Sequence, residues 1–193
     1  MQNCLKNIAV VFGGMSCENE ISVITGTMAA NVLDRERYVS HPVYLAQSGK
    51  FYTGKALFDV ANFRSGIESK AEEALFLDGK LCTVKGKKIK EVAWIDCGIN
   101  GCHGLGGEDG TVSALFALNR IPCASPVMAG SAVFMDKGLT KLVAKALGIK
   151  SAPWFRIGEA EYKKRAAMAL RCVEERIGYP VIVRPAYTLG GTG

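Results

Sequence analysis

The chain begins with a short apolar segment that ends in a pair of glycines, and this feature restricts the folds open to it. Residues 7–12 are Asn-Ile-Ala-Val-Val-Phe, and Gly13-Gly14 follow directly. Such a continuous apolar run predicts a strand buried on both faces, as in a parallel sheet. A helical pattern follows over residues 22–33 with Ser22 as its expected N-cap, and residues 42–46 predict the next strand. This order predicts a βαβ unit, which binds ligands at the carboxyl ends of its strands.

The rest of the chain predicts a change of organisation after about residue 124. Before that point the patterns indicate short helical pieces in 55–75, a hairpin over 75–90, strands at 92–97 and 121–124, and a helix at 111–118. After it they indicate helices at 125–134, 136–147 and 159–177, and strands at 153–157 and 180–184. We therefore expect an α/β protein with one domain over 1–124 and the beginning of a second over 125–193.

Composition excludes several classes of protein. The 193 residues are 49% hydrophobic and 22% charged, which is typical of a globular protein. No apolar run approaches the roughly 20 residues of a membrane helix, and no signal-peptide pattern occurs, so a cytoplasmic protein without a membrane partner is expected. The seven cysteines include no Cys-x-x-Cys pair and indicate buried thiols rather than a metal site.

The formal net charge of +6 is concentrated between residues 80 and 90, where five lysines alternate with other residues. This spacing is typical of a solvated edge strand, on which lysines discourage pairing with other chains. A nucleic-acid surface is the alternative, but no aromatic stacking residues accompany the lysines. We therefore expect no nucleic-acid partner.

A glycine-rich loop at residues 103–111, His-Gly-Leu-Gly-Gly-Glu-Asp-Gly-Thr, is the strongest candidate for a binding site. Glycines allow the backbone to turn tightly and to approach a ligand closely. His103 is one of two histidines, and its place in this loop favours a ligand-facing role over a structural one. The other, His41, has no glycines around it and is expected at the surface.

A second candidate is the segment at residues 13–20, Gly-Gly-Met-Ser-Cys-Glu-Asn-Glu. It lacks the third glycine of the dinucleotide-binding fingerprint. Glu18 stands near the start of a predicted helix, where it could complement the helix dipole or bind an ammonium group. The two preceding glycines favour the ammonium group. A third glycine-rich segment, residues 184–193, follows a predicted strand as a phosphate-binding loop would.

Three motifs support a more specific interpretation: residues 11–22, the loop at 103–111, and Met-Asp-Lys at 135–137. Their order and context resemble those of D-alanine–D-alanine ligases, ATP-grasp enzymes of peptidoglycan precursor synthesis, over residues 8 to about 157. The resemblance implies a Rossmann-like N-terminal domain followed by the start of an ATP-grasp domain. It also implies ATP-dependent ligation of two D-alanines through D-alanyl phosphate, with Mg²⁺ or Mn²⁺, and a homodimer through the N-terminal domain.

The same resemblance implies roles for individual residues. Glu18 matches the acid that holds the ammonium group of the first D-alanine, and His103 matches the loop histidine beside that substrate. Lys137 matches the lysine that contacts the ATP phosphates. Whether the second substrate is D-alanine, D-lactate or D-serine is left open.

The last 17 residues differ from the ligases and resemble the ATP-binding loop of carbamoyl-phosphate synthase large chains. Arg184 stands in place of a lysine, and Gly190 and Gly191 replace serines; with Gly193 these residues are expected around the phosphates. Both families place their metal ligands after this loop, so we expect those ligands beyond residue 193 and an inactive chain without them. Two alternatives remain: a carbamoyl-phosphate synthase-like ATP-grasp protein, and a non-catalytic remnant that binds an amino acid.

Overall fold

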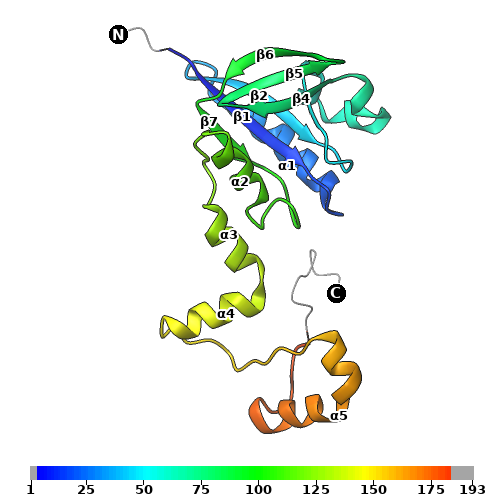
Figure 1. The fold of residues 1–193 in the computed structure, drawn as a ribbon, viewed down its shortest axis with the longest axis vertical. Coiled ribbons are helices and arrows are strands. Elements are labelled where there is room, and N and C mark those ends of the chain that lie inside the picture. Colours follow the sequence, from blue (N-terminus) through cyan, green and yellow to red (C-terminus); the bar gives the residue numbers. More distant parts are fainter. Residues whose placement is uncertain (1–3, 184–193) are drawn as a thin grey trace. The chain divides into compact units, whose positions relative to one another are not determined.

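A computed structural model describes residues 4–183 and divides the chain into two units (Figure 1). Unit 1 extends to Ala132, and unit 2 begins at Val133. The α/β fold expected from the sequence is confirmed by the mixed sheet of unit 1 and the helices packed on it. The domain boundary expected after residue 124 lies before this division and stays a prediction.

The described part of unit 1 contains a seven-stranded sheet in the order β6-β5-β4-β3-β2-β1-β7. The strands are β1 (Lys6–Gly13), β2 (Tyr38–Leu45), β3 (Phe51–Thr53), β4 (Glu72–Leu77), β5 (Lys80–Lys85), β6 (Lys88–Trp94) and β7 (Cys97–Asn100). β1 pairs in parallel with β2 and with β7, whereas β2 to β6 pair antiparallel. Helix α1 (Asn19–Val32) connects β1 to β2, which confirms the predicted βαβ unit.

β1 lies between two hydrophobic clusters because successive side chains of a strand point to opposite faces. Ala9 and Val11 face the cluster that contains Phe116 of helix α2 (Thr111–Leu118). Ile8, Val10 and Phe12 face the cluster on the α1 side. Burial on both faces explains why this strand is apolar at every position from residue 8 to residue 12.

The α1 face is also covered by the segment between β3 and β4. This segment forms three short 3₁₀ helices, which confirms the helical pieces expected in 55–75; they are Lys55–Phe58, Val60–Ser65 and Ile67–Ser69. Leu57 and Ile67 are buried and anchor the segment in the core.

The antiparallel half of the sheet differs in detail from its prediction. The segment predicted as one hairpin turns twice, at Asp78-Gly79 and again after Lys85, so it contributes three strands. β6 stands at an edge, as expected for the lysine-rich segment, and Lys80 pairs with Glu91 across the hairpin at 2.6 Å.

The single strand predicted at 92–97 is wrong. β6 ends at Trp94 and β7 begins at Cys97, although the two strands stand at opposite ends of the strand order. Only Ile95 and Asp96 separate them, with Ile95 N–H bonded to the Gly79 carbonyl and Asp96 N–H to the Asn7 carbonyl. The sheet therefore curls enough for two residues to connect its edges. The strand predicted at 121–124 is reduced to one bridge between Cys123 and Gly98.

Unit 2 contains helix α4 (Lys137–Ala146) and helix α5 (Glu159–Arg176), while helix α3 (Met128–Met135) spans the division. Asp136 caps α4 by accepting hydrogen bonds from the amides of Gly138 and Leu139. The strands predicted at 153–157 and 180–184 are not formed over their described residues, because residues 133–183 provide no neighbouring strand to pair with them. Within residues 4–183, no helix combines the length and apolar character that crossing a membrane requires.

Candidate substrate site

Two loops leave the carboxyl ends of neighbouring parallel strands in unit 1. The β1–α1 loop (residues 14–18) follows β1, and the β7–α2 loop (residues 101–110) follows β7. Both loops therefore emerge at the same edge of the sheet, where α/β folds bind their ligands. The two segments selected from the sequence as binding loops are brought together in this way.

Ser22 connects the starting points of the two loops through hydrogen bonds. The sequence suggested it as the N-cap of α1, and this is wrong: α1 begins at Asn19 with Glu18 at the cap position, where its side chain makes no capping hydrogen bond. The Ser22 hydroxyl is instead fully buried. It accepts a hydrogen bond from the Gly13 amide at 2.7 Å and donates one to the Gly101 carbonyl at 2.7 Å.

The carboxylate of Glu18 lies directly against the loop that carries His103. A Cβ atom placed on Gly104 would stand 2.7 Å from Glu18 Oε2, and Gly104 has a φ of +69°. Glycine is required here both by the close approach and by the left-handed backbone. Ser16 Oγ closes the junction by donating to the His103 carbonyl at 2.8 Å and accepting from the Glu18 amide at 3.1 Å.

The imidazole of His103 is oriented by Thr25 of α1, whose Oγ1 lies 2.9 Å from His103 Nε2. The same hydroxyl lies 3.1 Å from the Ile21 carbonyl, to which it can donate. A hydroxyl carries a single proton, so His103 Nε2 is the donor toward Thr25 when that proton goes to Ile21, and the acceptor when the proton goes to the imidazole. Glu18 and His103 are both half-buried, so each can be reached by a small ligand.

Side-chain hydrogen bonds from Asn100, the last residue of β7, and from Asp109 hold the shape of the β7–α2 loop. Asn100 Nδ2 donates to the Gly107 carbonyl, and Asn100 Oδ1 accepts from the Cys102 amide. Asp109 accepts from the amides of Gly106 and Thr111. Burial raises the pKa of Asp109, but these hydrogen bonds outweigh it and leave the pKa below its usual value. Asp109 is therefore ionised and stabilises the conformation of the loop.

The remaining predicted site residues lie elsewhere. Lys137 is the first residue of α4 in unit 2 and is half-buried. Its neighbour Asp136 is paired with Arg156 at 3.1 Å. Arg184, Gly190, Gly191 and Gly193 lie outside the described residues. Over residues 4–183, no three His, Cys, Asp or Glu side chains gather so that they could hold a metal ion.

Ser16 was selected only as part of the segment at residues 13–20 and received no role of its own. Thr25 was not selected, because a threonine outside a motif looks like any surface hydroxyl. Sequence reasoning also placed His41 at the surface, which is wrong. His41 is half-buried, and its Nε2 lies 2.9 Å from Asn7 Oδ1. Burial lowers the pKa of His41. Of the cysteines expected to be buried, Cys4 and Cys17 are exposed, whereas Cys82 and Cys102 are buried.

A carboxylate against the loop that carries a histidine, at the carboxyl ends of parallel strands, defines an α/β domain with a candidate small-molecule site. A family model described as the D-ala D-ala ligase N-terminus matches residues 7–126, and the chain belongs to this family. A second model, described as the carbamoyl-phosphate synthase L chain ATP binding domain, matches residues 136–193. Both resemblances drawn from the motifs are confirmed, and the second extends well upstream of the last 17 residues.

Individual relatives agree with the family models. The chain is 30% identical over 188 residues to a D-alanine–D-alanine ligase of Clostridium novyi, covering 97% of this chain and 52% of the relative. It is 35% identical over 190 residues to one of Thermosipho melanesiensis, covering 94% and 50%. The solved D-alanine–D-alanine ligase of Helicobacter pylori superimposes with a TM-score of 0.73 at 25% identity, covering 97% of this chain and 56% of that one. The chain thus spans about half the length of the curated relatives it matches.

Proposed function

We propose that this chain serves the ATP-dependent ligation of two D-alanines through a D-alanyl phosphate, in peptidoglycan precursor synthesis in the cytoplasm. Family membership supports the reaction, and one observation supports the substrate site: the Glu18 carboxylate lies against Gly104 in the loop of His103. An anionic group beside a glycine-rich turn is suited to an amino acid, whose ammonium group needs a carboxylate partner and whose small body needs little space.

In the proposed reaction, Glu18 binds the ammonium group of the first D-alanine, and His103, oriented by Thr25, lies beside that substrate. The carboxylate of this D-alanine takes the γ-phosphoryl group of ATP and releases ADP. The amine of the second D-alanine then attacks the acyl phosphate and releases phosphate. Holding the reacting groups in place supplies much of the rate of such a step, and this is the contribution we assign to unit 1.

ATP is assigned to the region matched by the ATP binding domain model, residues 136–193. We propose that Lys137 and Arg184 offset the charge of the phosphates, and that Gly190, Gly191 and Gly193 let the backbone approach them. Mg²⁺ or Mn²⁺ would further neutralise the triphosphate. Residues 4–183 offer no suitable set of metal ligands, so no step is assigned to the metal.

Calorimetry with D-alanine tests the substrate site. We expect D-alanine to bind and L-alanine to bind more weakly. Glu18→Gln should weaken D-alanine binding at least tenfold, because it removes a charge-assisted hydrogen bond. The matched control is Glu72→Gln, at an exposed carboxylate on β4. Failure of the chain to bind any D-amino acid, or equal binding by Glu18→Gln, would refute the assignment.

A carbamoyl-phosphate synthase-like function is the second candidate, because the second family model matches residues 136–193. That model concerns the ATP-binding part, whereas unit 1 matches the ligase family. In a longer, complete protein, ADP release separates the two reactions: stimulation by D-alanine supports the ligase, and stimulation by bicarbonate supports the synthase. D-alanine binding without ADP release in a longer, complete protein would support a non-catalytic amino-acid-binding protein. The inactivity expected for the 193-residue chain alone stays a prediction.

We also propose a homodimer through α1. Four large apolar side chains, spaced by three or four residues, form an exposed stripe along this helix; they are Ile21, Ile24, Met28 and Val32, with exposed fractions of 54%, 55%, 60% and 73%. A helix that is apolar on its outer face as well as on its inner face is normally covered on both. A two-fold axis across α1 would bury the stripe against its own copy.

Light scattering on the chain tests the dimer. The unmodified chain should have the mass of two copies, and Met28→Glu should shift it to one. The matched control is Leu77→Glu, which changes an equally exposed apolar residue on β4 and should leave the dimer intact. A monomeric unmodified chain, or a Met28→Glu variant that stays dimeric, would contradict the proposal.

A further inference from the structure

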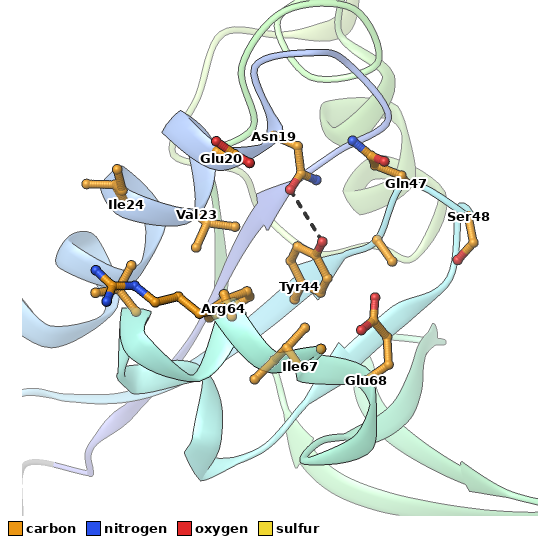
Figure 2. Close-up of a pocket in the computed structure, with 14 residues that line it drawn as sticks. Asn19, Glu20, Val23, Ile24, Tyr44, Gln47, Ser48, Arg64, Ile67 and Glu68 are labelled. Atoms are coloured by element: carbon orange, nitrogen blue, oxygen red, sulfur yellow. Dashed lines mark hydrogen bonds between the residues drawn. The ribbon is translucent and has the colours of Figure 1, made fainter.

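A cavity lies in unit 1, between the first half of α1, the end of β2 and the 3₁₀ segment (Figure 2). Its volume is about 570 Å³, within the range of roughly 300–1,000 Å³ that is usual for small-molecule sites. Glu18 and His103 do not line it. It is therefore separate from the candidate substrate site.

The walls of this cavity combine aromatic, apolar and anionic groups. Tyr44 and Phe63 form an edge-to-face pair with ring centroids 5.1 Å apart, and Val23 and Ile67 add apolar surface. Glu20 and Glu68 add two carboxylates to the lining, and both are drawn with Tyr44 in Figure 2. Aromatic faces together with carboxylates are the combination that recognises organic cations.

The single lining arginine does not reverse this preference. Arg64 is exposed, and Figure 2 shows its side chain extending toward Ile24 and away from Glu68. Glu68 faces Tyr44 closely enough for its charge to raise the pKa of the phenol, in addition to the larger effect of burial. The Tyr44 hydroxyl therefore keeps its proton, while its oxygen can accept a hydrogen bond from a ligand.

We propose that this cavity binds a small organic ammonium ion, with its cationic head at Tyr44 and Glu68 and its apolar body against Val23, Phe63 and Ile67, and that occupancy is transmitted to the β1–α1 loop. The binding half of this proposal is independent of the ligase assignment. The transmission half concerns the loop that carries Glu18, whatever substrate that loop holds.

A chain of hydrogen bonds supplies the transmission. Tyr44 Oη donates to Asn19 Oδ1 at 3.3 Å, and Asn19 Nδ2 donates to the Gly14 carbonyl at 2.6 Å. Both side chains are buried apart from the surface that they present to the cavity. An ammonium group that donates to Tyr44 Oη polarises the phenol and strengthens the long Tyr44–Asn19 bond. Asn19 is the first residue of α1 and directly follows Glu18, so its movement reaches the substrate loop.

Steric contact couples the same parts. A Cβ on Gly13 would stand 2.6 Å from Tyr44 Cε2, which shows how closely the phenol ring packs on the end of β1. Gly14, the next residue, begins the β1–α1 loop. A ligand that shifts the Tyr44 ring therefore also presses on the root of this loop.

Amide NMR titration of the full chain tests the proposal with three probes that share a four-carbon body: n-butylammonium, n-butyrate and 1-butanol. We expect saturable shifts at Ile67 and Glu68 with butylammonium, and binding at least tenfold weaker for the other two probes. Glu68→Gln should weaken butylammonium binding about tenfold, the loss expected for one charge-assisted hydrogen bond, while Glu72→Gln should not. Preferential binding of butyrate, or no effect of Glu68→Gln, would overturn the binding site.

The Tyr44→Phe variant tests the transmission separately, because it keeps the ring and its packing but removes the hydroxyl. In the unmodified chain, butylammonium should also shift the amides of Gly14 and Glu18 and the side-chain amide of Asn19. In Tyr44→Phe, shifts at Ile67 should persist at higher ligand concentration, whereas those at Gly14 and Glu18 should disappear. Unchanged shifts at Gly14 and Glu18 in this variant would overturn the relay.

Discussion

The replacement Ser22→Ala should destabilise unit 1 far more than an ordinary loss of a serine hydroxyl. Ser22 Oγ bonds two backbone groups at 2.7 Å each, the buried Gly13 amide and the part-buried Gly101 carbonyl. Alanine leaves both without this partner. An unsatisfied buried polar group costs about 1–3 kcal/mol, and the part-buried Gly101 carbonyl adds less because water can reach it, so the variant should lose about 1–4 kcal/mol of unfolding free energy. Because domains are stable by only about 5–15 kcal/mol, this loss is large.

A second serine provides a matched control. Ser40 Oγ on β2 is buried but has no hydrogen-bond partner among the described residues. Ser40→Ala removes a hydroxyl of the same size without breaking a bond, so it should change the unfolding free energy by less than about 0.5 kcal/mol or increase it. The pair therefore separates the value of the two bonds from the effect of deleting one oxygen atom.

Urea unfolding followed by tryptophan fluorescence measures both variants. Trp94 belongs to β6 of unit 1, whereas Trp154 belongs to unit 2, so a Trp154→Phe background makes the signal report unit 1. The Ser22→Ala midpoint should fall sharply with little change in slope. A loss below about 1 kcal/mol, or an equal loss in Ser40→Ala, would refute the reasoning.

Three further predictions follow from the contacts and pKa shifts above. Gly104→Ala should abolish D-alanine binding in calorimetry, because its Cβ would displace the Glu18 carboxylate. The control is Gly148→Ala, at a glycine with the same φ of +69° but with no atom within 4 Å of the added Cβ. This control should lose only about 1–2 kcal/mol of stability to backbone strain and should still bind D-alanine. Burial raises the pKa of the Cys102 thiol to about 12, so a thiol reagent at pH 8 should leave Cys102 unmodified until the chain unfolds, and detection of labelled Cys102 in the native chain by mass spectrometry would contradict this. Because the folded chain favours the protonated thiol, its stability should also fall as pH rises from about 9 toward 12. Burial lowers the pKa of His41, so the folded chain favours the neutral imidazole, and the stability of the chain should fall as pH drops below about 6.5. Urea unfolding midpoints at pH 7.5 and pH 5.5 measure this fall. A His41→Gln variant with the same pH dependence would exclude His41 as its cause.

The sequence predicted the parallel part of the fold well because local pattern and tertiary environment agree there. β1 is apolar throughout since both of its faces are covered, and the helix at 111–118 was placed within its observed bounds. The segment at 92–97 was misjudged because it reads as one apolar run. Only the pairing of Trp94 with Lys80 and of Cys97 with Ile8 shows that it crosses from one sheet edge to the other. Pairing partners distant in sequence are not contained in a local pattern.

The candidate site was predictable only where glycine or charge marked it. Glu18 and His103 stand in glycine-rich segments, and the structure brings their loops into contact. Thr25 and Ser22 could not be assigned to the site in the same way, because their roles depend on hydrogen bonds to His103 and Gly101, about 80 residues away in the chain. A hydroxyl in an apolar helix pattern looks like a cap or a surface group until its distant partner is known.

α1 shows why the apolar pattern was a poor guide to orientation. Its buried face carries the polar Asn19 and Ser22 beside the apolar Val23, whereas Ile24 and Met28 on the outer side are exposed. Burying polar groups is costly unless each has a partner, and the hydroxyl of Ser22 and the amide of Asn19 both bond backbone atoms of the substrate loops. The polar residues on the inner face of α1 therefore hold the substrate loops in place, while its apolar outer face is available for the proposed dimer. A helix that buries polar groups while it exposes a row of large apolar side chains indicates a functional element more strongly than its individual residues do, because stability of the isolated domain alone would favour apolar residues inside and polar residues outside.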